Sequence, residues 1–200
     1  LMLAADCDSR VIKAVSEATK FLVEGGLMEY SQARKLSITE SHCLDVILRK
    51  TASAMSLSCE LAALLSEANP EQEKALVEFG TQFGMAFQLM DDAMDYDSEE
   101  DRLGKPPGND FQEGHVTLPL LHLYENSDSS LKKEIEGFVE NENLTQEDFD
   151  YVLERMREAK SIEYTLGLAH NYLEQAKASF RSVTFPRPEY IKSLDAVADY

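Results

Sequence analysis

The sequence has 200 residues, 44% of them apolar, which is enough to bury one sizeable core and favours a single domain over residues 1–200. Its formal net charge of −18 at pH 7 creates a negative field that repels nucleic-acid backbones and anionic lipid surfaces, so no nucleic-acid partner is expected. No apolar run approaches the roughly 18 residues needed to span a bilayer, so no transmembrane segment is expected.

The three cysteines, Cys7, Cys43 and Cys59, are odd in number and widely spaced, a pattern typical of buried free thiols in a reducing compartment. The opening run, residues 1–5, lacks the basic flank of a secretory signal, so we expect a cytoplasmic protein. The chain begins with Leu1 in the middle of an apolar pattern, and we expect a fragment that is incomplete at its N-terminal side.

Helical periodicity runs through the sequence without sustained period-two alternation and predicts an all-α chain. A first helix is expected over residues 8–30, with Gly25 and Gly26 interrupting its far end. A second helix is expected from a cap at residue 39 or 41 to about Ala68.

Asn69 and Pro70 are expected to be the N-cap and first residue of a third helix that reaches Tyr96. The glycines and prolines of residues 97–114 predict a long loop of the kind that usually has a function. Further helices are expected over residues 116–124, 128–139, 145–160 and 161–180, with a short one through residues 191–197.

In the third predicted helix, four polar residues stand at i, i+3, i+4 and i+7 and therefore project from one stripe: Gln88, Asp91, Asp92 and Asp95. Like charges this close repel one another unless solvent or a cation neutralises them. Carboxylates on one helix face suit Mg²⁺, which takes one or two of them and completes its shell with water and phosphate oxygens. In a chain this acidic, a solvated helix face is the alternative interpretation.

The surroundings of the stripe favour the metal site. The stripe continues backwards through Gly84 and Phe87, so it is expected to face packed protein or a cavity, with Gly84 making room. Lys50 lies beside Thr51 among apolar and small residues, and Lys105 follows the aspartates in the predicted loop. Each lysine taken alone would be an ordinary surface residue, but together they supply the ammonium groups that a diphosphate needs.

These residues resemble a known family. Residues 84–95 (GMAFQLMDDAMD), 103–106 (LGKP) and 110–119 (DFQEGHVTLP) resemble the second aspartate-rich region of trans-polyprenyl diphosphate synthases. Residues 50–52 (KTA) and 23–29 resemble two further elements of that family. The resemblance implies an isoprenoid-synthase-like helical bundle, Mg²⁺ as cofactor and the homodimer usual in the family. It also implies a reaction that joins an allylic diphosphate to isopentenyl diphosphate by ionisation, condensation and loss of a proton.

The resemblance assigns the charged residues to the diphosphate of the substrate. Asp91 and Asp95 would belong to the magnesium–diphosphate site, with Asp92 beside them. Lys50 and Lys105 would bind the leaving diphosphate, which is itself the expected base.

The resemblance gives the uncharged residues other roles. Gln88 and Thr51 would turn oxygen dipoles towards the allylic carbocation, and Phe87 would pack near the isopentenyl group. His115 stands where the family usually has lysine, so we expect a weaker, pH-dependent diphosphate contact there. Gly26 replaces a residue that is commonly acidic or amide, which leaves Glu29 without an expected role.

The family's first aspartate-rich motif and its arginine pair have no counterpart in these residues. Because catalysis needs the cation held between both carboxylate clusters, we predict that the 200 residues alone do not transfer prenyl groups and that the complete protein does.

Other interpretations stay open at this point. A non-catalytic subunit of a heteromeric prenyl synthase would keep the fold and lack a complete site. An acidic helical interaction module would have no ligand, and it would leave Gly84, Gln88 and the Lys105 loop unexplained. Terpene cyclases share the helical class, but their second metal motif differs from the one found here.

Overall fold

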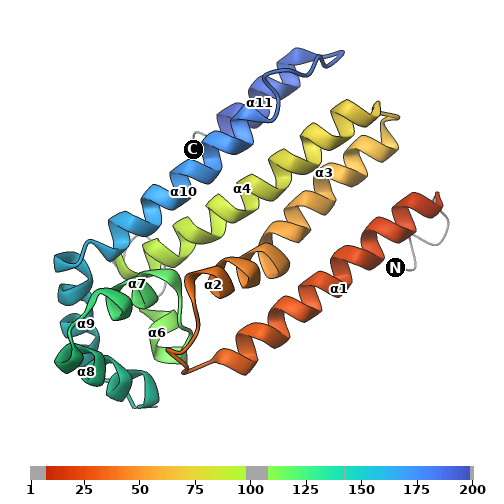
Figure 1. Ribbon diagram of the computed structural model, residues 1–200. Helices are drawn as coiled ribbons and strands as arrows, with labels where there is room; N and C mark the ends of the chain where they lie inside the picture. Colours follow the sequence, from red (N-terminus) through yellow and green to blue (C-terminus); the bar gives the residue numbers. More distant parts are fainter. Residues whose placement is uncertain (1–7, 98–107, 142, 199–200) are drawn as a thin grey trace. The chain divides into compact units, whose positions relative to one another are not determined.

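The computed structural model describes residues 8–97, 108–141 and 143–198, and over these residues the chain forms helices and no strand (Figure 1). The all-α prediction is confirmed. The chain divides into two compact units: a first unit of Leu1–Gly26, Ile47–Gln88 and Ala169–Tyr200, and a second unit of Leu27–Val46 and Leu89–Leu168. The prediction of a single domain stays a prediction. None of the described helices combines the length and apolar character that crossing a bilayer requires.

Long helices lying side by side build the first unit (Figure 1). Helix α1 (Ser9–Gln32) packs on α3 (Ser53–Leu65) through Val11, Ala14 and Leu64. The ring of Phe79 on α4 (Pro70–Asp97) stacks on that of Phe180, just after α10 (Ser161–Ala178), at 4.8 Å between centroids. Three of these helices, α1, α4 and α10, continue into the second unit. The shorter helix α11 (Pro188–Ala198) also belongs to this unit.

Local signals placed the start of the third predicted helix correctly. The side-chain oxygen of Asn69 accepts hydrogen bonds from the backbone N–H groups of Glu71 and Gln72, both at 3.0 Å, which satisfies two of the donors left open at a helix start. The resulting helix α4 runs without a break through the whole acidic stripe.

Two predictions near the start of the chain are wrong. Gly25 and Gly26 do not interrupt the first helix, which continues to its last residue, Gln32. The second predicted helix is not continuous: α2 (Glu40–Ile47) passes into a π-helical turn, η2 (Leu48–Ala52), before α3 begins.

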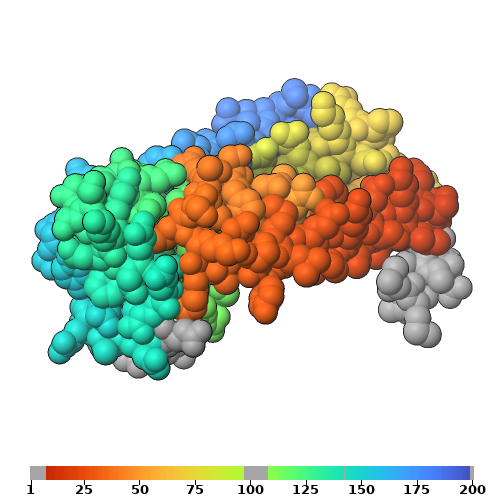
Figure 2. All heavy atoms as spheres, turned by 60° about the horizontal axis from the view of Figure 1, so that its bottom comes forward, coloured from red at the N-terminus to blue at the C-terminus, as the bar shows by residue number. Residues whose placement is uncertain are grey.

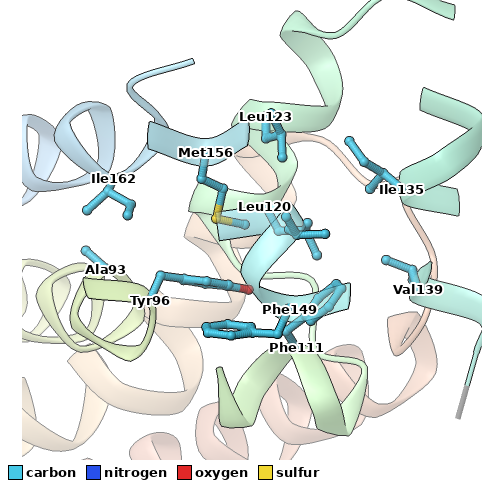
Figure 3. Packing of buried hydrophobic residues seen from close by; sticks show 11 residues of the cluster. Ala93, Tyr96, Phe111, Leu120, Leu123, Ile135, Val139, Phe149, Met156 and Ile162 are labelled. Atoms are coloured by element: carbon cyan, nitrogen blue, oxygen red, sulfur yellow. The ribbon is translucent and has the colours of Figure 1, made fainter. Parts of the chain in front are cut away.

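Shorter helices contribute to one hydrophobic core in the second unit, in which aliphatic side chains surround three aromatic ones (Figure 3). The rings of Tyr96 and Phe149 stack at 6.3 Å between centroids, and Phe111 lies against the same Phe149. The predicted capping pair is confirmed, because Thr145 and Asp148 each bond the other's backbone N–H at the start of α9 (Gln146–Glu158). Besides α2, the helices are α6 (Asn109–Glu113), α7 (Leu118–Asn126), α8 (Ser129–Glu140) and α9 (Gln146–Glu158).

The predicted loop over residues 97–114 is wrong in its last part, where α6 forms. Gly108 and Gly114 bound this helix with φ of 78° and 81°, a left-handed conformation that favours glycine, so the short helix fits between two glycine turns. Residues 98–107, which include Lys105, lie outside the described residues.

Candidate diphosphate and metal site

Helix α4 holds the four residues of the acidic stripe in one regular register. Asp91 is exposed, whereas Asp92 and Asp95 are only 5% and 3% exposed. Burying a carboxylate is costly unless hydrogen bonds or a cation compensate it, so the stripe is no ordinary solvated face. The expectation that the stripe faces packed protein or a cavity agrees with the burial of Asp92 and Asp95, and it stays a prediction at the exposed Asp91.

Two backbone N–H groups just beyond the undescribed residues bind Asp95. The N–H of Gly108 donates to the Asp95 carbonyl at 2.7 Å, and the N–H of Asp110 donates to Asp95 Oδ2 at 3.0 Å. These bonds tie the start of α6 to the last turn of α4 and fix one oxygen of the Asp95 carboxylate.

Asp110 also reaches His115, the predicted diphosphate ligand at the far end of α6. His115 Nδ1 lies 3.8 Å from Asp110 Oδ1, and hydrogen bonding to that carboxylate, with smaller contributions from Glu29 and Glu113, raises the pKa of His115 above its ordinary value of 6.5 against the opposing effect of burial. His115 therefore stays protonated to a higher pH than an isolated histidine does. Asp110 was not predicted as a site residue, although it opens the segment that resembled the family.

In the first unit, η2 and α4 bring two of the predicted catalytic residues together. The hydroxyl of Thr51 donates to Gln88 Oε1 at 2.8 Å, and both side chains are partly exposed. Lys50, the preceding residue of the turn, is exposed, and Phe87 is 51% exposed on α4. The turn therefore presents a cation and a hydroxyl on consecutive residues.

The carboxylates of α4 suit a hard divalent cation, because Mg²⁺ prefers oxygen donors. Within the described ranges, no three His, Cys, Asp or Glu side chains come together closely enough to hold an ion by themselves. Mg²⁺ usually binds through one or two carboxylates and takes its remaining oxygens from water and phosphate, so Asp91 and Asp95 would fit as its protein ligands.

Nucleophilic chemistry has little support in the buried groups near the stripe. Burial, with the nearby Asp92 carboxylate, raises the pKa of the Cys43 thiol to about 12, so this buried thiol stays protonated. Burial likewise raises the pKa of the Tyr96 phenol. Both Cys43 and the partly buried Cys59 are free, as predicted, and Cys7 lies outside the described residues.

Comparison with known families identifies the class of protein. The polyprenyl synthetase family matches residues 1–156, well beyond the part of the sequence that carried the recognised motifs. The chain belongs to this family.

Individual relatives agree with this assignment. The chain is 37% identical over 154 residues to heptaprenyl diphosphate synthase component 2 of Bacillus subtilis, covering 77% of this chain and 42% of that protein. It is 33% identical over 172 residues to octaprenyl diphosphate synthase of Escherichia coli, covering 86% and 53% of the two chains. The chain thus spans about half the length of the curated relatives it matches.

A solved structure confirms the predicted architecture. Polyprenyl synthase from Caulobacter crescentus, crystallised with calcium and isoprenyl diphosphate, superposes with a TM-score of 0.89 and 29% identity, over 96% of this chain and 58% of that one. The all-α isoprenoid-synthase-like bundle is therefore confirmed as the fold.

Proposed function

We propose that this chain is part of a trans-prenyltransferase that condenses an allylic diphosphate with isopentenyl diphosphate to give a longer polyprenyl diphosphate. The observation that carries the proposal is the uninterrupted helix α4, which keeps Gln88, Asp91, Asp92 and Asp95 in the register of a diphosphate-binding stripe in a chain of the polyprenyl synthetase family. Two relatives are named as heptaprenyl and octaprenyl diphosphate synthases, and the Caulobacter crescentus structure contains calcium and isoprenyl diphosphate, which supports the same chemistry.

In the proposed reaction, the bond between C1 and oxygen of the allylic diphosphate breaks and its electron pair leaves with the diphosphate. The double bond of isopentenyl diphosphate then attacks the allylic carbocation, and a proton passes from the new chain to the released diphosphate. Lys50, Lys105 and His115 hold diphosphate oxygens. Bound to Asp91 and Asp95, with Asp92 beside them, Mg²⁺ would supply positive charge that offsets the charge of the leaving group.

Thr51 and Gln88 act on the carbocation. Because Thr51 donates its proton to Gln88, the lone pairs of the Thr51 oxygen remain directed elsewhere and can stabilise positive charge that develops on the substrate. Phe87, half exposed on the same helix, is proposed to pack against the isopentenyl group.

The proposal is tested by binding of a bisphosphonate, a stable diphosphate analogue, to the full-length protein with and without Mg²⁺. We expect magnesium-dependent binding that Asp91→Ala weakens by at least about tenfold, because one hard ligand of the cation is lost. Asp150→Ala changes an exposed aspartate of α9 and is the matched control. If even the full-length wild-type protein does not bind, the acidic interaction module becomes the better interpretation.

For the assembly, we propose a homodimer. Apolar side chains of α1 support it, since Phe21, Leu22 and Val23 are 43%, 46% and 53% exposed on a helix that lies open at the surface in Figure 2. The name of the Bacillus subtilis relative, component 2, supplies a second candidate, a heteromeric synthase. The mass of the purified full-length protein in solution distinguishes them, because a chain that needs a different partner stays monomeric alone.

A further inference from the structure

The first unit contains a short π-helical turn, η2. Its five residues, Leu48–Ala52, separate two ordinary α-helices, and a π turn of this kind is rare and occurs frequently at functional sites. It contains both Lys50 and Thr51. The contacts on its two sides show what holds it.

On one side, α1 approaches η2 so closely that only glycine fits. A Cβ atom at Gly25 would lie 2.8 Å from the backbone nitrogen of Lys50 and 2.9 Å from Cβ of Arg49. The neighbouring Glu24 forms an ion pair with Arg49, in which Arg49 Nη1 lies 2.7 Å from Glu24 Oε2. The same guanidinium lies 5.2 Å from the ring centre of Phe21. The first half of the turn is thus fixed to α1.

On the other side, α4 approaches the end of the turn. A Cβ atom at Gly84 would lie 2.5 Å from Cα of Ala52, which is completely buried. One helical turn further along α4, Gln88 accepts the hydrogen bond from Thr51. The second half of the turn is therefore fixed to α4, and Lys50 lies between the two attachments with its side chain exposed.

From these contacts we infer that Glu24, Gly25 and Gly84 are positioning residues: they seat η2 between α1 and α4 so that Lys50 meets the substrate diphosphate, and Thr51 the allylic carbocation, in the productive geometry. The inference rests on the proposed function. A methyl group at Gly25 collides with backbone and Cβ atoms, which have no flexible end that could turn aside, so the turn itself must move. Displacements of about 1 Å near reacting groups can lower rates by about 10²-fold.

Gly26 supplies a matched control. It is the next residue of the same helix, and a Cβ atom there would meet nothing within 4 Å. Both substitutions by alanine raise helix propensity by the same amount, so any difference between them reports the contact with η2.

The experiment measures the dissociation constant of inorganic pyrophosphate with Mg²⁺, and kcat and KM for prenyl transfer, in the full-length protein. We expect Gly25→Ala to weaken pyrophosphate binding by about tenfold or more and Gly26→Ala to change it less than about twofold. Glu24→Gln removes the ion pair with Arg49, together with a longer one to Lys20, without adding volume, and we expect about two- to fivefold weaker binding. If Gly25→Ala does not fold, the binding measured for Glu24→Gln tests the inference in its place. Glu17→Gln, in an exposed ion pair of the same helix, is its control.

A double variant separates positioning from general destabilisation. If Gly25 acts through Lys50, Gly25→Ala has no further effect on pyrophosphate binding in a Lys50→Ala background. Equal losses in both backgrounds, or wild-type binding by Gly25→Ala where Lys50→Ala is impaired, overturn this inference and leave the proposed function intact. Wild-type binding by Lys50→Ala overturns the proposed role of Lys50 and this inference with it.

Discussion

Asp110 extends the pH range over which His115 is protonated, because it raises the pKa of His115. Because the carboxylate raises the pKa of His115 in the folded protein, the pair stabilises the fold fully below about pH 6.5, the unfolded value, and this contribution is lost as the pH rises through the folded pKa. We predict that His115→Gln lowers the free energy of unfolding by about 0.5–1 kcal/mol at pH 5.5 and by less at pH 8.5.

Urea denaturation at both pH values measures the effect. The exposed His170→Gln is the control and should show no comparable difference. The same loss at both pH values for His115→Gln would mean that Asp110 does not control the histidine.

Gly114, at the end of α6, makes room for a side chain that joins three segments of the second unit. Arg34 donates its backbone N–H to the Gly114 carbonyl at 2.8 Å, and its guanidinium donates to the carbonyls of Val139 at 2.9 Å and Asn141 at 3.2 Å. A Cβ atom at Gly114 would lie 2.6 Å from Cγ of Arg34, and φ there is 81°. Arg34 thus connects Gly114 to the end of α8.

We predict that Gly114→Ala destabilises the protein by about 2–3 kcal/mol, because it adds the cost of a left-handed alanine to the loss of hydrogen bonds at the end of α8. Gly137→Ala, on α8 in open space, should instead stabilise by up to about 1 kcal/mol. Chemical denaturation measures both. Similar values for the two variants would show that neither the left-handed conformation of Gly114 nor its contact with Arg34 contributes to stability.

Helix starts such as those at Asn69 and Thr145 could be predicted because capping depends on hydrogen bonds within three residues. The π turn could not, because its close approach to α1 joins Gly25 to Lys50, far along the chain, and the apolar periodicity within the turn looks the same as in an α-helix. Asp110 is an intermediate case: its segment was recognised, but its bond to Asp95 depends on how α6 folds back.

For the candidate site residues, too, local features could be predicted and those that depend on distant segments could not. The stripe on α4 needed only the helical repeat, so the register of its four polar residues was predictable. Their exposure was not, because burial of Asp92 and Asp95 depends on neighbouring segments that local spacing does not specify.

The whole chain carries one aspartate-rich motif and about half the length of its curated relatives. If the cation must be held between two carboxylate clusters, the 200 residues contain only one of the two. We predict that this chain alone transfers prenyl groups at least about 10³-fold more slowly than the full-length protein, because the charge of the leaving diphosphate is neutralised from one side only.

The assay uses a geranyl or farnesyl diphosphate starter, labelled isopentenyl diphosphate and Mg²⁺. Circular dichroism of the 200-residue chain must show a folded helical protein for the comparison to hold. The rate of prenyl transfer by Asp91→Ala in the full-length protein is the rate expected when one carboxylate cluster is impaired. A rate from the 200-residue chain close to that of the full-length protein would mean that the α4 carboxylates suffice for the reaction and that the requirement for a second cluster is wrong.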